Sequence, residues 1–306
     1  MKILFAGSPN SSATILKSLS KGSFDIVGVL SQPDKRSKRG KYKEPSPVSA
    51  EALKLGIPTF KPFSLDQLFQ KKIASLSFDF LVVVAYGKVL PEWLLNSPKI
   101  APINIHFSLL PKYRGASPIQ AAILNNDKTT GISIMKMSIG MDEGPVYCFY
   151  EQEILSSDSK SDLEKKLTSL CVKNLSKDLE KIFNNKHIPL EQNANDVSYC
   201  TKINKLSGRI DFNKEKTFAI FQKHKAFFGW PGLYFEKNKR AIKIHGLTEY
   251  NQNIDGQMDK IFKFVSNGLA VKTRDTQIVI THLQFPGKRI IHSVDAANSY
   301  AKFFEQ

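Results

Sequence analysis

Residues 79–86 read DFLVVVAY, a run in which six consecutive side chains are apolar and three of them are valine. Such a run is typical of a parallel strand that is buried on both faces of a sheet. Shorter apolar runs at 2–6 and 25–30 flank a helical stretch that covers residues 11–22. Strands that alternate with helices in this way predict βαβ units and a doubly wound, Rossmann-like α/β domain.

The rest of the chain has a different pattern. Residues 131–154 predict a β-ribbon, and a long amphipathic helix is expected from Ser161. Periodicity is then lost, and after Gly208 a helix at about 216–228 precedes short alternating strands, which favour a small antiparallel barrel. We therefore expect three parts, which are an α/β domain over 1–188, a linker over 189–204 and a smaller β domain over 205–306.

Composition limits the class of protein. At 306 residues the chain is long enough for two domains with sizeable cores. No run approaches the roughly 18 apolar residues that span a bilayer, and the N-terminus reads as a core strand, so we expect neither a membrane contact nor a signal peptide. Three scattered cysteines form no CxxC pair and no disulfide pattern, which indicates a reducing, cytoplasmic compartment.

The net charge of +16 is the unusual bulk property. Residues 201–306 carry 18 Lys or Arg against 9 Asp or Glu, and residues 35–43 contain six basic side chains and no acidic one. A solvated, lysine-rich surface would account for the total. The clustering favours a polyanionic partner, because phosphate backbones release counterions when grouped cations neutralise them.

Residues 101–115, APINIHFSLLPKYRG, place polar side chains at the end of an apolar run. Asn104 and His106 stand two positions apart, so in an extended strand they project from the same face. A glycine-flanked loop, GMDEG, carries Asp142, whose carboxylate would orient the histidine. An amide donor, an imidazole and a carboxylate can stabilise an oxyanion and move protons during acyl transfer to an amine. We therefore predict that Asn104, His106 and Asp142 form a catalytic set.

Two other kinds of site are not expected. The turn after the first strand reads GSPN and lacks the GxGxxG spacing of a dinucleotide fingerprint. The remaining histidines stand singly, without the spacing of metal ligands, so we predict no metal site.

Several motifs match a known family. The segments NIHFSLLPKYRGASPIQ (104–120) and GMDEG (140–144) contain Asn-x-His-x-Ser-Leu-Leu-Pro, a basic residue and Arg-Gly, Pro-Ile-Gln, and Gly-x-Asp-x-Gly. Further matching pieces are KILFAGSP (2–9), QPDKRSKRGKYKEPSPV (32–48) and KAFFGWPG (225–232). Together they resemble the folate-dependent formyltransferases over essentially the whole chain, and within that family they point to members that act on methionyl-initiator tRNA.

The resemblance implies that the formyl group of 10-formyltetrahydrofolate is transferred to the α-amino group of methionyl-initiator tRNA, for translation initiation, by a monomeric enzyme. It implies a formyltransferase domain over 1–188 and an OB-fold-like, tRNA-binding domain over 205–306. It places the folate against seven residues, which are Tyr86, Gly87, Leu90, Ser108, Leu109, Leu110 and Pro111. It assigns contact with the tRNA acceptor end to the 35–43 segment, through Lys35, Arg36, Lys38, Arg39, Lys41 and Lys43.

Two alternatives stay open at this point. A relative acting on a small amine, such as glycinamide ribonucleotide or an amino sugar nucleotide, would share the catalytic motif. The first kind normally lacks a C-terminal barrel and the second lacks the KRSKRG-type segment. A non-catalytic RNA-binding protein would use the basic barrel alone and would not need the Asn104, His106 and Asp142 set.

Overall fold

The structure is a computed structural model that describes residues 1–36, 43–252, 256 and 258–305. It divides the chain into two compact units. Unit 1 comprises residues 1–122, 128–155 and 162–201, and unit 2 comprises residues 123–127, 156–161 and 202–306. Within the described ranges, no helix combines the length and the apolar character that crossing a membrane requires.

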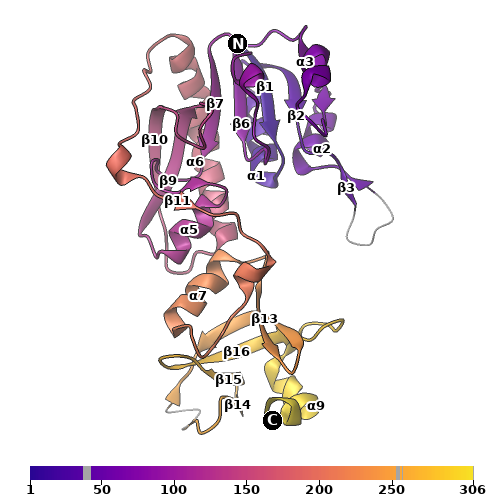
Figure 1. Cartoon of the computed structure of the whole chain (residues 1–306), viewed down its shortest axis with the longest axis vertical. Coiled ribbons are helices and arrows are strands. Elements are labelled where there is room, and N and C mark those ends of the chain that lie inside the picture. The colour runs from indigo at the N-terminus through magenta and orange to yellow at the C-terminus, as the bar shows by residue number, and fades with distance from the viewer. Residues whose placement is uncertain (37–42, 253–255, 257, 306) are drawn as a thin grey trace. The chain divides into compact units, whose positions relative to one another are not determined.

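A seven-stranded sheet forms the centre of unit 1 (Figure 1). Its order is β10-β9-β7-β6-β1-β2-β5, and all neighbouring strands from β7 to β5 are parallel, whereas β9 runs antiparallel to both of its neighbours. After β1, the chain adds β2 and β5 on one side of β1. It then crosses over and adds β6 and β7 on the other side, so the strand order reverses between β1 and β6. The bounds are β1 (Lys2–Gly7), β2 (Asp25–Leu30), β5 (Thr59–Phe60), β6 (Phe80–Val84), β7 (Ala101–His106), β9 (Thr129–Lys136) and β10 (Val146–Glu153).

Strand β6 is buried along its whole length, as the apolar run predicted. It ends at Val84 because Ala85 and Gly87 adopt positive φ angles of 47° and 80°, which turn the chain out of the sheet. The doubly wound α/β prediction is confirmed, although the strand is shorter than the DFLVVVAY run.

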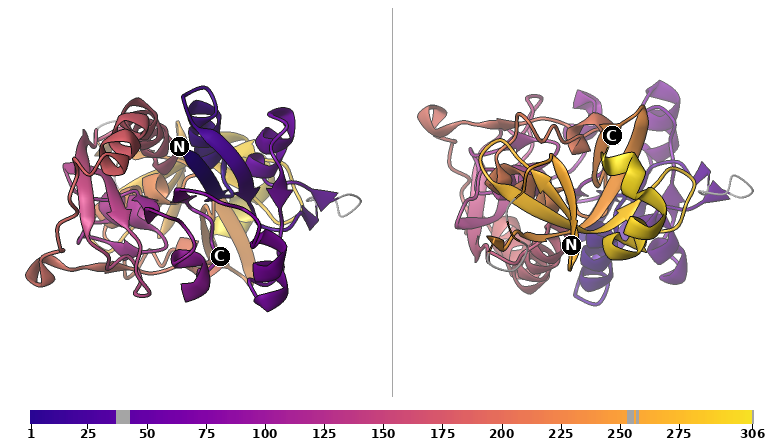
Figure 2. Two further views of the ribbon diagram at one scale, coloured as in Figure 1. Left: turned by 90° about the horizontal axis from the view of Figure 1, so that it is seen from above. Right: turned by 90° about the horizontal axis from the view of Figure 1, so that it is seen from below.

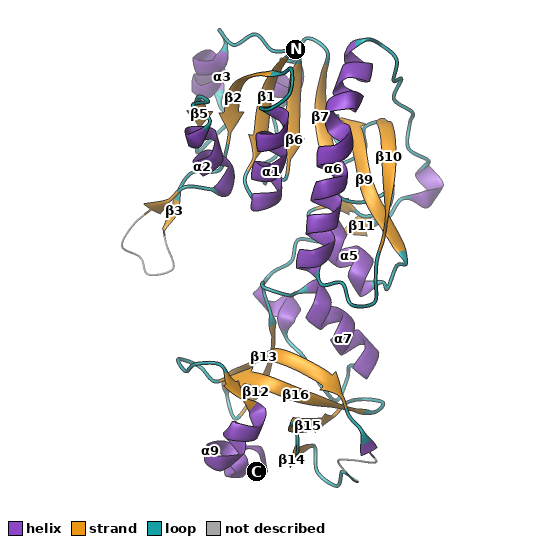
Figure 3. Cartoon of the chain, turned by 180° about the vertical axis from the view of Figure 1, so that it is seen from behind, coloured by secondary structure: helices purple, strands orange, loops and turns teal. Residues whose placement is uncertain are grey.

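Helices cover both faces of this sheet, which explains why β6 is apolar on both sides. Helices α1 and α6 lie on the same face (Figures 2 and 3), and the hydroxyl of Ser11 on α1 donates to Glu164 on α6 at 3.0 Å. On the other face, alternate residues of β1 and β6 join one apolar cluster with side chains of α3 and α4. The helices of unit 1 are α1 (Asn10–Leu19), α2 (Pro47–Lys54), α3 (Gln67–Ile73) and α4 (Glu92–Leu95). Helices α5 (Pro118–Leu124) and α6 (Lys160–Phe183) span the boundary with unit 2, and all but the first two residues of α6 belong to unit 1.

Helix α6 and the β9–β10 hairpin match the predicted long helix and β-ribbon. The helix buries a charged residue among its apolar ones, because the side chain of Asp178 is 1% exposed. Both of its carboxylate oxygens lie 2.9 Å from the donating hydroxyl of Tyr150 on β10, and His187 Nε2 lies 3.8 Å from Oδ1. Burial raises the pKa of Asp178 above its ordinary value, against the opposing effects of Tyr150 and His187.

Unit 2 contains an antiparallel sheet with the order β12-β13-β16-β15-β14, and β17 pairs with β16. This confirms the predicted C-terminal β domain. Strands β14 and β15 form a hairpin around Ser266 and Asn267, close to the predicted Asn267-Gly268 turn. The elements are α7 (Thr217–Ala226), β12 (Leu233–Lys237), β13 (Arg240–Glu249), β14 (Phe262–Val265), β15 (Gly268–Lys272), β16 (Gln277–Gln284), β17 (Ile291–His292) and α9 (Ser293–Glu305).

Helix α9, which closes one side of this sheet, was not predicted from the sequence. Its Phe304 is buried, with ring centroids 5.5 Å from Phe262 and 5.7 Å from Phe264 on β14. Helix α9 has few large apolar residues before its last turn. Its apolar periodicity was therefore too weak to distinguish it from the preceding loop.

The buried carboxylate of α6 gives a prediction about stability and pH. Because the pKa of Asp178 is raised in the folded protein, its contribution to stability is fully present below the unfolded value of about 4 and is lost as the pH rises through the raised value. We expect Asp178→Asn, which keeps an acceptor for Tyr150, to gain stability relative to the wild type as the pH rises above about 4. Urea unfolding of both proteins across this range measures the difference; parallel curves would contradict the assignment.

Candidate active site at the carboxyl ends of the central strands

The predicted catalytic residues lie where the strand order of unit 1 reverses. Ligands of open α/β sheets bind at this edge, beyond the carboxyl ends of the strands. His106 is the last residue of β7, and Asn104 pairs with Val83 on one side and with Met135 on the other. Both side chains therefore come from a central strand, in which Asn104 is paired on both sides and His106 is paired with Ser133 on β9.

Asp142 meets both residues from the loop between β9 and β10. Its Oδ1 accepts a hydrogen bond from Asn104 Nδ2 at 3.2 Å, and its Oδ2 accepts one from the backbone N–H of Gly115 at 2.8 Å. His106 Nδ1 lies 3.6 Å from Oδ2, a distance longer than a hydrogen bond. The structure thus brings the predicted residues Asn104, His106 and Asp142 together, with the carboxylate bonded to the amide and to Gly115.

The other nitrogen of His106 has a partner within the protein. Nε2 lies 2.9 Å from the carbonyl oxygen of Tyr113, which only accepts, so Nε2 carries the hydrogen. The ring is 5% exposed. Its orientation is therefore set between the Tyr113 carbonyl at one end and the Asp142 carboxylate at the other.

The SLLP loop after β7 is fixed by a buried serine of β9. The Ser133 hydroxyl accepts from the backbone N–H of Leu110 at 2.9 Å and donates to the carbonyl of Ser108 at 2.6 Å. The Ser108 hydroxyl in turn donates to the carbonyl of Lys112 at 2.5 Å. Consequently the backbone of this loop has a defined conformation next to His106.

The residues predicted to bind folate fall into two groups. Gly87, Leu109 and Pro111 are exposed or half-buried, whereas the side chains of Tyr86, Leu90, Ser108 and Leu110 are buried. Tyr86 and Leu90 belong to the apolar cluster on the α3 and α4 face, which is core packing. The Tyr86 carbonyl accepts from Ser8 Oγ at 3.2 Å and Gln32 Nε2 at 3.0 Å, so this loop is also held through its backbone.

Burial also affects the phenol of Tyr86. It raises the pKa of Tyr86 to about 12, so the ring stays uncharged at neutral pH. The buried hydroxyl has no hydrogen-bond partner among the residues that the structure describes. The Tyr86 side chain therefore provides an uncharged, largely apolar surface next to the loop that follows β6.

Two residues that contact the Asp142 loop, Arg114 through Glu143 and Gln192 through backbone carbonyls, were not predicted from the sequence. Arg114 lies in the short strand β8 (Arg114–Gly115), and Gln192 lies in the segment that was predicted as a linker. Gln192 donates to the backbone carbonyls of Asp142 and Gly144. A glutamine in a segment without periodicity carries no sequence signal of a buried contact, so only the structure identifies it.

The predicted basic segment is described at its two ends only. Lys35 and Arg36 form β3 (Lys35–Arg36), which pairs with β4 (Lys43–Glu44), and Figure 1 shows β3 projecting from unit 1. The other predicted tRNA-binding residues of this segment, Lys38, Arg39 and Lys41, lie outside the described residues.

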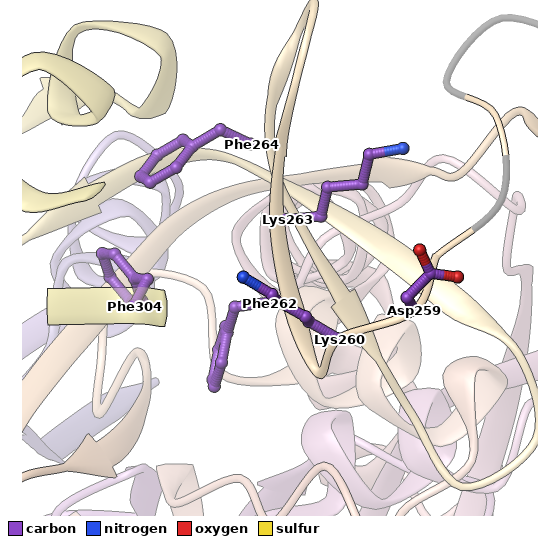
Figure 4. A pocket seen from close by; sticks show the side chains of 6 residues that line it. All are labelled: Asp259, Lys260, Phe262, Lys263, Phe264 and Phe304. Carbon is purple, nitrogen blue, oxygen red and sulfur yellow. The ribbon is translucent and has the colours of Figure 1, made fainter. Parts of the chain in front are cut away.

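A separate cavity of about 300 Å³ lies in unit 2. Figure 4 shows the rings of Phe262, Phe264 and Phe304 on its walls, together with the side chains of Asp259, Lys260 and Lys263. No residue of the predicted catalytic or folate-binding sets lines it, so this cavity is distinct from the site at the edge of the unit 1 sheet.

Comparisons with known proteins agree with this organisation. Residues 1–179 match the family model described as "Formyl transferase", and residues 202–301 match "Formyl transferase, C-terminal domain". The chain is 38% identical over 301 residues to the methionyl-tRNA formyltransferase of Francisella tularensis subsp. mediasiatica, covering 97% of this chain and 95% of that one. It is 37% identical over 303 residues to the methionyl-tRNA formyltransferase of Sulfurihydrogenibium sp., covering 98% and 97%.

A solved structure shows the same fold. WlaRD, a sugar 3N-formyl transferase whose structure was determined in the presence of dTDP and 5-N-formyl-THF, superposes with a TM-score of 0.67. The sequence identity is 23%, and the match covers 94% of this chain and 99% of that chain. This likeness concerns the fold, which formyltransferases with different acceptors share.

The Ser133 bridge gives a prediction about the stability of the site. Ser133→Ala leaves the buried N–H of Leu110 and the carbonyl of Ser108 without this partner, so we expect the free energy of unfolding to fall by about 2–3 kcal/mol. Ser97→Ala is the matched control, since its exposed hydroxyl donates only to the Trp93 carbonyl, and it should cost less than about 1 kcal/mol. Denaturant unfolding compares them, and equal losses would show that the bridge contributes nothing special.

Proposed function

This chain belongs to the formyltransferase family, and we propose that its Asn104, His106 and Asp142 site transfers a formyl group from 10-formyltetrahydrofolate to the α-amino group of methionyl-initiator tRNA. The observation that supports the chemistry is the convergence of these three side chains at the carboxyl edge of the sheet. The observation that supports the acceptor is 38% identity over 97% of the chain to a methionyl-tRNA formyltransferase. We further propose that the enzyme acts as a monomer in the cytoplasm.

Asn104 is suited to stabilise the oxyanion that forms on the formyl oxygen. One N–H of its amide is held by Asp142, and the same nitrogen lies 4.0 Å from the sulfur of Met135, a weak contact. The hydrogen bond to Asp142 fixes the amide plane, and we propose that the substrate oxygen replaces the weak Met135 sulfur as the second acceptor of this amide. A preorganised donor of this kind lowers the barrier by about 3–4 kcal/mol.

His106 and Asp142 are suited to move the proton. In the reaction a C–N bond forms between the α-amine and the formyl carbon, the bond from that carbon to N10 of the folate breaks, and one proton leaves the amine while N10 gains one. A free α-amine has a pKa near 8, so a mild base is sufficient. The imidazole next to a carboxylate provides one, and it returns the proton to the leaving nitrogen.

We propose that the folate lies against the loops that follow β6 and β7. The partly accessible residues Gly87, Leu109 and Pro111 supply surface, and the buried members of the predicted set hold the loop backbones in place. Backbone N–H and carbonyl groups held in this way can recognise the edge of a flat pterin ring.

The positive charge supports the polyanionic acceptor. Residues 201–306 carry twice as many basic as acidic side chains, and Lys35, Arg36 and Lys43 extend the basic surface on unit 1. We propose that both regions contact tRNA phosphates. The sugar nucleotide alternative is supported only by fold-level likeness, and a non-catalytic RNA-binding protein would have no use for the convergent site.

Catalytic substitutions test the reaction. His106→Ala and Asn104→Ala should each lower kcat by about 100- to 1000-fold and leave folate binding within a small factor, because both side chains are proposed to act on the transition state and not on the folate ring. Asn96→Ala, at the exposed end of α4, is the control and should keep normal activity. Formylation of charged initiator tRNA, an amino sugar nucleotide and glycinamide ribonucleotide is measured side by side; preference for a small amine would overturn the proposed acceptor.

Charge substitutions test the tRNA contact. Replacing Lys35, Arg36 and Lys43 with glutamine should weaken tRNA binding and make its dependence on salt less steep, by a slope of about 0.9 for each phosphate that is no longer neutralised. The matched control replaces Lys165, Lys173 and Lys177, which are exposed on α6, and should leave the slope unchanged. Identical slopes for the two triple variants would remove this segment from the tRNA contact.

A further inference from the structure

The segment of residues 190–201, here called the strap, packs against the loops that carry the proposed catalytic groups. At its start, Leu190 and Val146 on β10 exchange two backbone hydrogen bonds of 2.8 and 2.9 Å. At its end, β11 (Tyr199–Cys200) pairs in parallel with β8. In Figures 1 and 3 the strap passes beside β10 before it reaches β11. Although it was predicted as a linker, it is part of unit 1.

Gln192 is the residue of the strap that contacts the Asp142 loop directly. Its Nε2 donates to the carbonyl oxygen of Asp142 at 2.8 Å and to that of Gly144 at 2.7 Å. Its Oε1 accepts two hydrogen bonds from Arg114, one from Nε at 3.0 Å and one from Nη2 at 2.9 Å. Both N–H groups and both lone pairs of the amide are therefore used.

These contacts join the two loops on which the carboxylate depends. Arg114 is 8% exposed and precedes Gly115, whose N–H donates to Asp142 Oδ2. Asp142 itself has a φ of 54°, a left-handed conformation that is unfavourable for residues other than glycine and that surrounding contacts must maintain. Gln192 binds the carbonyl of that same residue and, through Arg114, the loop that supplies its hydrogen-bond partner.

We propose that Gln192 is a positioning residue that holds the Asp142 carboxylate against Asn104 and His106 during formyl transfer. The inference rests on the proposed function of this site. Glutamine is required because its amide offers two donors to the carbonyls and an acceptor to Arg114. Asparagine is one methylene too short to reach both sides, and glutamate has no donor.

Gln192→Glu tests this role with almost no change in shape. The new carboxylate still pairs with Arg114, so the strap remains anchored, but it faces the carbonyls of Asp142 and Gly144 without a donor. We expect kcat to fall by about 10- to 100-fold, with the KM values for both substrates within about 3-fold. Asn193→Asp is the matched control, because it makes the same chemical change at the next, exposed residue, and it should keep the wild-type kcat.

A double variant separates positioning from a general structural role. If Gln192 acts through Asp142, then in an Asp142→Asn background Gln192→Glu should lower kcat by less than about 2-fold further. An equal fold-loss in both backgrounds, or a single variant with the wild-type kcat, would overturn the proposal. A wild-type protein that fails to formylate methionyl-tRNA would instead refute the proposed function, so the two failures are distinguishable.

Discussion

Two hydrogen bonds to the Asp142 carboxylate hold the candidate site together, because they connect three loops or strand ends that are distant in the chain. Oδ1 accepts from Asn104 near the end of β7, and Oδ2 accepts from the N–H of Gly115 in the short strand β8. Asp142 sits in a left-handed conformation between β9 and β10, so its carboxylate reaches both partners only while that backbone is maintained. The geometry of Asn104 and His106 as a pair therefore depends on a residue about 40 positions away in sequence.

The fold supplies what this arrangement needs. Parallel pairing on both sides of β6 and β1 places strand ends at one edge, and the reversal of strand order leaves room there for a ligand. Buried polar groups destabilise the fold unless they form hydrogen bonds. In this site Ser133 bridges the backbone of the SLLP loop, and the Tyr113 carbonyl accepts a hydrogen bond from His106 Nε2. These bonds fix the donors in place, so the proposed reaction would need little reorganisation of the site.

The elements that could be predicted from the sequence are those in which burial of one or both faces gives the side chains a regular spacing. The apolar run of β6, the two-residue spacing of Asn104 and His106, and the amphipathic α6 were all readable, because one face or both faces of each element pack against the core. It missed α9, whose large apolar residues gather in its last turn. It also missed Gln192, because a polar residue that bonds to backbone carbonyls leaves no pattern. The burial of the Tyr86 and Leu90 side chains likewise depends on how α3 and α4 pack, which a family motif does not reveal.

The fold by itself does not identify the acceptor amine. A sugar 3N-formyl transferase shares this fold at a TM-score of 0.67. Beyond its amine, a tRNA carries a long array of phosphates. Clustered Lys and Arg side chains bind such an array favourably, because neutralising the phosphates releases counterions. The excess of nine positive charges in residues 201–306 and the basic hairpin ends at β3 and β4 fit such an array. In the proposed function, formyl transfer uses uncharged donors and one carboxylate held in a small volume, whereas recognition of the acceptor uses charge spread over a much larger surface.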